Sequence, residues 1–403
     1  MKPVQLVPLT VNIGGQLADH EIIGREATVK LMFEYLDRGM NLSINDPRRI
    51  GKSAALQLLE AASTDKTKVV LTSVQPVKTI DGFFYHLASV LHGHQSLGRR
   101  LRKGVTNLVE SARVMTEVDG VPFAVGVRGR HQHKTKRELL MEMVSAIDDA
   151  LGEGELLVLA VDEFTEAILN IARNPDAGSG DATQLLQTLQ MLRKDCPAVR
   201  WILTGSIGMH HAIRWTDCTS SVVSGDCKNV PVGALSLAHA DYLSRCLALG
   251  EDIALVDEAH VALIEAVDGI PILIHAIIED LRKQPARDAF DQSDVEAAID
   301  RYIHDQDESR AFEHFVSRLA TYYFDDELPI ARALLDRSAG RKKPYKVDKL
   351  VAHAAEACGA TTEVVRTVLG MVVDDHYLIT EEGRARWRYP ILARVWRTKR
   401  NLG

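Results

Sequence analysis

The chain has few cysteines and no apolar run that is long enough to cross a membrane. Its 403 residues include five cysteines, dispersed without a C-x-x-C pair, so we expect no disulfide framework and a reducing, cytoplasmic setting. No apolar stretch approaches the roughly 18 residues that span a bilayer, and we therefore expect no membrane partner. The net charge of −7 excludes a chain that is basic overall, as general nucleic-acid binders are, but leaves a local basic surface open.

Strands and helices alternate in the first half of the chain. The predicted strands are 40–44, 69–74, 156–161 and 199–204, and the predicted helices are 26–38, 54–62, 81–91 and 182–194. An unbroken apolar run such as 156–161 is typical of a strand that is buried on both faces of a parallel sheet. The segment around Asp119-Gly120 suggests a hairpin or an irregular insertion. Together these patterns predict an α/β layer fold from about residue 40 to residue 205.

The second half of the chain has almost no strand pattern. Helical periodicity runs from 236 to 300 and resumes at 310. Near the end, 377–380 and 384–389 predict two strands joined by the tight turn Glu381-Glu-Gly383. Several helices followed by strand, turn and strand predict that the chain ends in a winged helix.

Residues 45–53 contain most of a phosphate-binding loop. The pattern is Gly, any four residues, then Gly-Lys-Ser or Gly-Lys-Thr, and Gly51, Lys52 and Ser53 stand where it requires them. A predicted strand precedes the loop and a predicted helix follows it, which is the context that the motif needs. Lys52 would reach the β- and γ-phosphates of a nucleotide, and the Ser53 hydroxyl would complete the shell of Mg²⁺. The alternative is a chance Gly-Lys-Ser in an ordinary loop.

Asp46 occupies the first glycine position of this loop. A carboxylate near the phosphates would repel them, and a Cβ at this position would constrain the turn. Arg48 and Arg49 are the neighbouring cations that would offset the charge, unless they are simply solvated. We expect weakened or slower hydrolysis, with nucleotide binding retained.

An acidic pair follows the apolar strand 156–161. Asp162 would hold Mg²⁺ through its water shell, and Glu163 would polarise the attacking water as general base. The alternative is an acidic pair that only caps the next helix. Because a phosphate loop lies 110 residues upstream, counted from Lys52 to Asp162, the catalytic interpretation is favoured.

Polar residues also follow the next predicted strand. Thr204 and Ser206 would lie beside the acidic pair, where they would sense the γ-phosphate or hold the lytic water. A turn-forming Gly-Ser is the alternative. Arg214 is a candidate finger toward a neighbouring subunit, although an exposed arginine is common. Pro271 opens a helix in a favourable first-turn position, which by itself is a helix start and nothing more.

Assembled, these motifs resemble those of the prokaryotic and archaeal P-loop ATPases of the STAND group, which are relatives of AAA+ proteins. The resemblance covers nearly the whole chain. It is carried by Ile23-Gly-Arg-Glu26, Pro47-Arg-Arg-Ile-Gly-Lys-Ser53, Asp162-Glu-Phe164, Thr204-Gly-Ser206, Gly269-Ile-Pro271, and a C-terminal set of Asp374–Ile379, Arg388-Tyr-Pro390 and Val395-Trp396. Asp46 departs from the family pattern, and no long repeat array follows the winged helix, so the built-in ligand sensor of the group is missing.

The resemblance implies ATP and Mg²⁺ as ligands and a defined set of site residues. Catalytic roles fall to Glu163, Lys52, Ser206 and Thr204, and Mg²⁺ to Ser53 and Asp162. The nucleotide-binding set is Gly24, Arg25, Asp46, Pro47, Arg48, Arg49, Ile50, Gly51, Lys52, Ser53, Ala54 and Pro271. Ile23–Glu26 is similar to the family's adenine-side box, and the lid proline implies contact with the base.

The resemblance also implies a domain order. We expect an N-terminal segment at 1–20, a P-loop ATPase core with a parallel sheet at 21–235, a helical lid at 236–305 and a winged helix at 306–403. In the family the winged helix closes over the nucleotide and opens upon exchange. Because no sensor array follows it, a separate effector or sensor protein is the expected partner, and a homo-oligomer is compatible with the AAA+ kinship.

Three hypotheses about function remain open at this point. The favoured one is an ATP-hydrolysing switch of the STAND or AAA+ type that acts with a partner protein in defence or stress signalling. The second is a DNA-associated ATPase of the initiator or transposition-helper type, whose winged helix grips DNA through Arg384, Arg386 and Arg388. The third, motivated by Asp46, is a slow ATPase or a pseudo-enzyme that binds nucleotide as a clamp.

Overall fold

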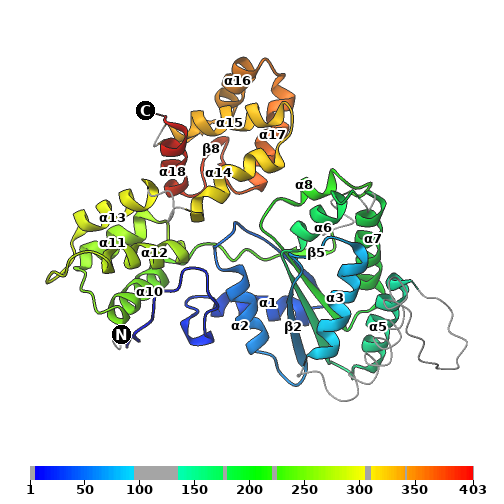
Figure 1. Ribbon diagram of the computed structural model, residues 1–403. Helices are drawn as coiled ribbons and strands as arrows, with labels where there is room; N and C mark the ends of the chain where they lie inside the picture. Colours follow the sequence, from blue (N-terminus) through cyan, green and yellow to red (C-terminus); the bar gives the residue numbers. More distant parts are fainter. Residues whose placement is uncertain are drawn as a thin grey trace, which may run out of the picture. The chain divides into compact units, whose positions relative to one another are not determined.

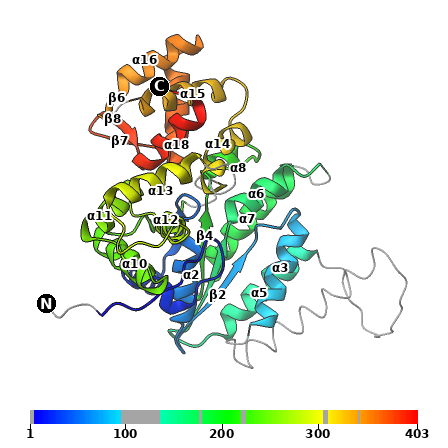
Figure 2. The same cartoon turned by 60° about the vertical axis from the view of Figure 1, so that its left-hand side comes forward.

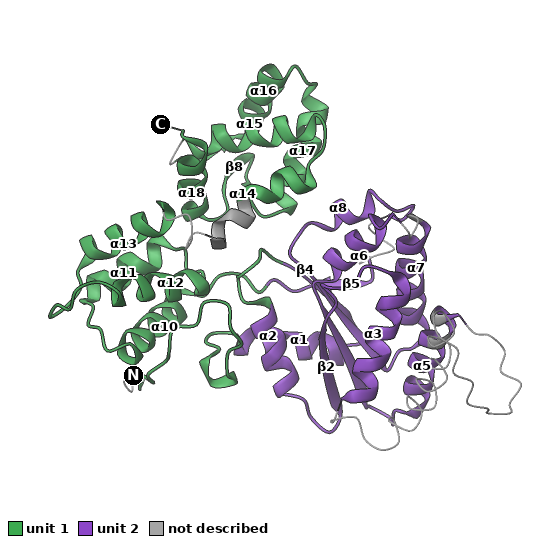
Figure 3. Ribbon diagram, in the orientation of Figure 1, with its two compact units in different colours: residues 1–25, 46–52, 232–403 green, residues 26–45, 53–231 purple. Residues whose placement is uncertain are grey.

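The computed structural model describes residues 5–94, 135–175, 179–219, 225–304, 310–340 and 343–402. The chain forms two compact units, coloured separately in Figure 3. We call residues 26–45 and 53–231 the sheet unit, and residues 1–25, 46–52 and 232–403 the helical unit. The hairpin that we predict around Asp119-Gly120 lies outside the described residues. The four predicted domain segments stay predictions.

The sheet unit is built on five parallel strands in the order β2-β3-β4-β1-β5. The strands are β1 (Asn41–Asn45), β2 (Thr67–Ser73), β3 (Leu156–Asp162), β4 (Val199–Gly205) and β5 (Cys227–Asn229). β3 lies inside the sheet between β2 and β4, and its unbroken apolar sequence is typical of a strand whose two faces are both covered by helices. The predicted parallel sheet is confirmed. The edge strand β5 was not predicted, since three residues give no periodic signal.

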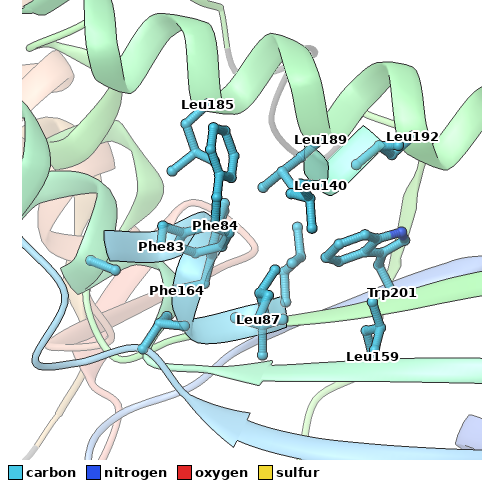
Figure 4. Packing of buried hydrophobic residues seen from close by; sticks show 14 of the residues in the cluster. Phe83, Phe84, Leu87, Leu140, Leu159, Phe164, Leu185, Leu189, Leu192 and Trp201 are labelled. Atoms are coloured by element: carbon cyan, nitrogen blue, oxygen red, sulfur yellow. The ribbon is translucent and has the colours of Figure 1, made fainter. Parts of the chain in front are cut away.

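Helices cover both faces of this sheet. They are α1 (Glu26–Asp37), α2 (Lys52–Ala61), α3 (Ile80–Gly93), α5 (Lys136–Ala150), α6 (Phe164–Ala172), α7 (Ser179–Asp195) and α8 (Met209–Ile213). Figure 1 shows α1 and α2 on one face and α3, α5 and α7 on the other, and Figure 2 shows α2 and α3 on opposite sides of β2. Alternation along the strands places Leu159 and Trp201 on the second face, where they pack with Phe83, Phe164 and Leu189 in a buried cluster (Figure 4). Burial of this apolar surface fixes the strand ends that carry the polar residues described below.

The helical unit contains two groups of helices. The first group is α10 (Leu237–Gly250), α11 (Asp257–Ala266), α12 (Pro271–Arg282) and α13 (Gln292–His304). The second is α14 (Arg310–Tyr322), α15 (Glu327–Ala339), α16 (Val347–Cys358), α17 (Thr362–Asp374) and α18 (Pro390–Arg400). The strands β6 (Tyr345–Lys346), β7 (Leu378–Glu381) and β8 (Arg384–Trp387) form an antiparallel sheet in the order β6-β8-β7. The predicted helical C-terminal half and its strand–turn–strand are thus confirmed.

The N-terminal segment packs on the first helical group. Leu9 donates its N–H to the carbonyl of Cys246, and Asn12 donates its N–H to Nδ1 of His275 at 3.1 Å. A Cβ at Gly250 would lie 2.0 Å from the carbonyl oxygen of Leu9, so this approach requires glycine. Among the described helices, none is both long and apolar enough to cross a membrane.

Candidate nucleotide site

The phosphate loop lies between β1 and α2, as the motif requires. Asn45 ends the strand, Lys52 begins the helix, and the turn is made by Arg49 with φ 66° and Gly51 with φ 104°. Asp46 does not have a positive φ. Our expectation that a Cβ at this position constrains the turn is therefore wrong, because the left-handed residues of this loop are further along the chain.

Lys52 is buried and bonded to the loop itself. Its Nζ donates to the carbonyl oxygen of Asp46 at 2.7 Å and to that of Pro47 at 2.9 Å. These bonds hold the ammonium at the mouth of α2, where the N-terminal dipole of a helix favours anions. An entering phosphate would take over the ammonium from these two carbonyl groups.

The Asp46 carboxylate is fully buried, at 0% exposure. Oδ2 accepts a hydrogen bond of 2.7 Å from the backbone N–H of Val232. The Arg388 guanidinium lies 3.8 Å from Oδ1 and forms an ion pair with it. Arg388, 342 positions away in the chain, is thus an ion-pair partner of Asp46 to which the sequence did not point. Compensation by Arg48 and Arg49 stays a prediction.

Arg25, predicted on the adenine side, braces the phosphate loop. Its guanidinium donates to the carbonyl of Ile50 at 2.6 Å and to that of Val232 at 3.0 Å, and the residue is 3% exposed. Gly24 precedes it with φ 70°. A contact of this pair with an adenine base stays a prediction.

The acidic half of the site lies at the carboxyl ends of β3 and β4, in the sheet unit. The Ser53 hydroxyl donates to Asp162 Oδ2 at 2.6 Å, and the Thr204 hydroxyl donates to Asp162 Oδ1. Asp162 and Thr204 are buried, whereas Ser53 is exposed. Both oxygens of the Asp162 carboxylate are therefore fixed in direction by hydroxyl groups from different elements.

Glu163 has a backbone that few non-glycine residues adopt. Its φ of 56° and ψ of 35° are left-handed, and its N–H donates to Asp162 Oδ1 at 3.0 Å and to the Thr204 hydroxyl at 3.1 Å. The Glu163 side chain accepts a 2.8 Å hydrogen bond from Ser206. Although Glu163 stands at the N-cap position of α6, its side chain makes no capping bond, which speaks against the helix-capping alternative.

Gly205 lets these strand ends approach closely. A Cβ at this position would lie 2.2 Å from Oγ1 of Thr165 in α6. Thr204 and Ser206 on either side bond to Asp162 and Glu163, so the Thr-Gly-Ser segment is more than a turn. In the described structure the Thr204 hydroxyl orients Asp162, whereas γ-phosphate sensing by Thr204 stays a prediction.

The donor set around Asp162 suits Mg²⁺. The ion prefers hard oxygen ligands and keeps several waters, and Ser53 Oγ and Asp162 Oδ2 are two such oxygens, 2.6 Å apart. Thr204 and the N–H of Glu163 already orient the carboxylate from behind, as a second layer of hydrogen bonds does in metal sites. The residues present therefore fit the ion.

The remaining predicted residues lie outside these two hydrogen-bonded groups. Pro271 is the first residue of α12, and Arg214 is exposed at the end of α8. Ala54 follows Ser53 in α2 and is half-buried. The roles that we expect for Pro271 and Arg214 stay predictions.

Sequence reasoning missed Val232 and the contact of Arg388 with Asp46. Val232 is an apolar residue that acts through its backbone N–H and C=O groups, which no motif marks. The sequence groups Arg388 with Arg384 and Arg386 as a DNA contact, and that contact stays a prediction. In the structure Arg384 donates to the carbonyl of Pro344 and Arg386 pairs with Glu381. A buried aspartate does signal the need for a partner, but the sequence does not say which one.

Comparison with known proteins establishes the fold. No protein-family model and no curated protein sequence matches the chain. The solved structure of the Walker-type ATPase PABY2304 of Pyrococcus abyssi matches 96% of this chain and 99% of that one, with a TM-score of 0.65 and 17% identity. The chain has the fold of a P-loop ATPase. The RuvB Holliday junction branch migration motor of Thermotoga maritima also matches, at 13% identity over 91% of this chain and 92% of that one, with a TM-score of 0.40.

Proposed function

We propose that this protein is an ATP-binding and ATP-hydrolysing switch of the STAND or AAA+ type that uses Mg²⁺. The observation that carries the proposal is the array in which Ser53 bonds to Asp162 and Ser206 bonds to Glu163. Lys52 and Ser53 are consecutive residues of α2, so a phosphate at the start of this helix would lie next to that array. The fold shared with a Walker-type ATPase supports the same activity.

Each residue of the array has a defined task in hydrolysis. Lys52 and the N–H groups at the start of α2 would hold the β- and γ-phosphates, exchanging the bonds that Lys52 makes to Asp46 and Pro47. Mg²⁺ bound near Ser53 and Asp162 would neutralise charge on the phosphate oxygens. Glu163 would accept the proton of the attacking water, with one carboxylate oxygen held by Ser206 and the other available.

The switching part of the proposal concerns the helical unit. We place a helical lid at 236–305 and a winged helix at 306–403, with nucleotide exchange changing their arrangement and exposing a surface for an effector or sensor protein. The support is the contact of the phosphate loop with Val232, which precedes the first region, and with Arg388, which lies in the second. The DNA-associated alternative has less support, because the three arginines on which it depends contact protein groups.

The test is a paired measurement of binding and turnover. Purified protein with Mg²⁺ and ATP should bind nucleotide in calorimetry and release inorganic phosphate. Lys52→Ala should weaken ATP binding by at least about 10-fold, because a charged hydrogen-bond partner is lost. Lys194→Ala, at an exposed helical lysine, is the control and should match wild type.

Three results of this test would change the proposal. Wild-type protein that binds no ATP would refute it. Binding without phosphate release would favour the nucleotide clamp. Phosphate release that rises with added DNA, together with DNA binding at about 50 mM salt that falls steeply with salt, would favour the DNA-associated ATPase.

A further inference from the structure

Val232 is held by both of its backbone groups. Its N–H donates to the Asp46 carboxylate at 2.7 Å, and its C=O accepts from Arg25 at 3.0 Å. Arg25 also donates to Ile50 at 2.6 Å. The phosphate loop is thus joined to Val232 in two ways. Asp46 bonds to Val232 directly, and Ile50 is joined to it through the Arg25 guanidinium. Val232 lies in the linker between β5 and α10, so the start of the helical region is fixed to the loop.

The same carboxylate faces the C-terminal region of the helical unit. Arg388 follows β8 and precedes α18, and its guanidinium is 3.8 Å from Asp46 Oδ1. Oδ1 is buried and has no hydrogen-bond partner among the described groups. A buried carboxylate without a nearby cation would be strongly unfavourable. One side chain at the first loop position therefore contacts two segments that lie far apart in the sequence.

We call the contacts of the Asp46 carboxylate with Val232 and Arg388 the anchor, and Lys52 connects this anchor to ligand binding. Its ammonium is bonded to the backbone carbonyl of Asp46, the residue whose side chain holds Val232. A phosphate that takes the ammonium frees that carbonyl and changes the forces on the Asp46 backbone. The change has a direct route to Val232 and Arg388, because both touch the Asp46 carboxylate.

We propose that Asp46 is a positioning residue that ties the phosphate loop to Val232 and Arg388 and transmits nucleotide binding to the linker and the C-terminal region. This inference rests on the proposed function, since it requires a phosphate ligand. It also gives the aspartate at the first glycine position of the loop a different role from the one that the sequence suggests. The carboxylate does not oppose the phosphates; its charge is used by Arg388 and the N–H of Val232.

Hydrogen exchange on the full-length protein without nucleotide tests the anchor directly. Asp46→Ala removes the acceptor, so peptides covering 230–236 and 384–389 should exchange faster than in wild type, by about 10-fold or more at Val232. Asp46→Asn keeps a carbonyl acceptor for Val232 but loses the charge, so only 384–389 should respond. Arg388→Gln should reproduce the Asp46→Asn pattern. Asp288→Ala, at an exposed aspartate of the same unit, should change neither segment, and the β3 peptide should be constant throughout.

Addition of ATP and Mg²⁺ tests the transmission. In wild type, exchange should change in the loop, at 230–236 and at 384–389. In Asp46→Ala the loop should still respond, but the other two segments should not. Kinetics give a second readout: Asp46→Ala and Asp46→Gly should raise KM for ATP by about 10-fold, whereas Asp46→Asn should stay within about 3-fold of wild type in KM.

Each opposite outcome has a distinct meaning. Equal exchange at 230–236 in wild type and Asp46→Ala would overturn the anchor. A loop response in wild type without a response at 230–236 or 384–389 would overturn the transmission. Faster turnover in both Asp46→Gly and Asp46→Asn would restore the repulsion hypothesis. Absence of any loop response, together with no calorimetric binding, would refute the proposed function and the transmission, while exchange without nucleotide would still decide the anchor.

Discussion

The two units use the charged groups of their candidate site residues in different ways. In the sheet unit, Asp162 and Glu163 accept hydrogen bonds from hydroxyl groups of Ser53, Thr204 and Ser206. In the helical unit, Lys52 and Asp46 bond to backbone groups of the loop and linker. The acidic residues of the sheet unit are thus oriented by hydroxyl groups, whereas the loop is tied to neighbouring segments of its own unit.

The difference indicates that the acidic side chains are already oriented for their proposed role, whereas the loop would rearrange when a phosphate binds. Strand ends in a packed sheet are held by the surrounding core, so the acidic side chains need little rearrangement to act. The loop has to exchange bonds when a phosphate enters, and its carboxylate passes any change to the linker. The following predictions test this contrast, from the largest expected effect to the smallest.

Glu163→Gln should abolish most turnover while leaving ATP binding intact. An amide retains the shape and the bond from Ser206 but is not a general base, so kcat should fall on the order of 10²-fold to 10⁴-fold. Phosphate release and calorimetry measure the two quantities. Glu153→Gln, at an exposed glutamate, is the control. Unchanged kcat in Glu163→Gln would remove Glu163 from the chemistry.

Thr204→Val should weaken the response to Mg²⁺. The valine has nearly the same shape but no hydroxyl for Asp162, and loss of such an orienting bond typically costs 10-fold to about 100-fold in metal affinity. The Mg²⁺ concentration for half-maximal turnover is the measurement, with Thr204→Ser expected near wild type. If the Mg²⁺ response is unaltered but discrimination of ATP from ADP is lost, Thr204 is a γ-phosphate sensor, as the sequence suggested.

Ser206→Ala should lower kcat by about 10-fold with little change in ATP affinity. The Glu163 carboxylate would lose the hydrogen bond that fixes one of its oxygens. The free energy of a hydrogen bond to a charged group corresponds to about a 10-fold change in rate. Ser206→Thr, which keeps the hydroxyl, should retain more activity than Ser206→Ala. An equal loss in both would point to packing around this buried residue.

Asp268→Asn should change the pH dependence of stability in the helical unit. Burial raises the pKa of Asp268 to about 6, although the N–H of Ile391 and the charge of Arg386 act in the opposite direction. A folded-state pKa above the ordinary value means that the stability contributed by this group is present below about pH 4 and lost as pH rises through about 6.

The free energy of unfolding of Asp268→Asn minus that of wild type should therefore be larger at pH 7.5 than at pH 4.5, by about 1 kcal/mol. One pKa unit is worth about 1.4 kcal/mol, and solvent screens part of this effect. The amide oxygen can still accept from Ile391, and asparagine tolerates the positive φ of 54°. Urea unfolding at the two pH values measures the difference. A pH-independent difference would contradict the assignment.

Much of the fold could be predicted from short-range patterns. The apolar runs of β3 and β4 mark buried strands because a parallel sheet covers both faces, and periodic leucines mark α7. β5 and β6 escaped detection, since strands of three and two residues have no periodicity of their own. Their positions follow from partners elsewhere in the chain.

The same division applies to the site. The sequence alone determined that Lys52 and Ser53 start a helix after a strand. It also determined that Asp162-Glu163 stand where another strand ends, because motif and periodicity are local properties. The direction and the partners of the Asp46 side chain were decided by tertiary structure. Its partners, the N–H of Val232 and the guanidinium of Arg388, are 186 and 342 positions away. The direction of a buried carboxylate depends on which donors the fold brings to it, and no local pattern contains that information.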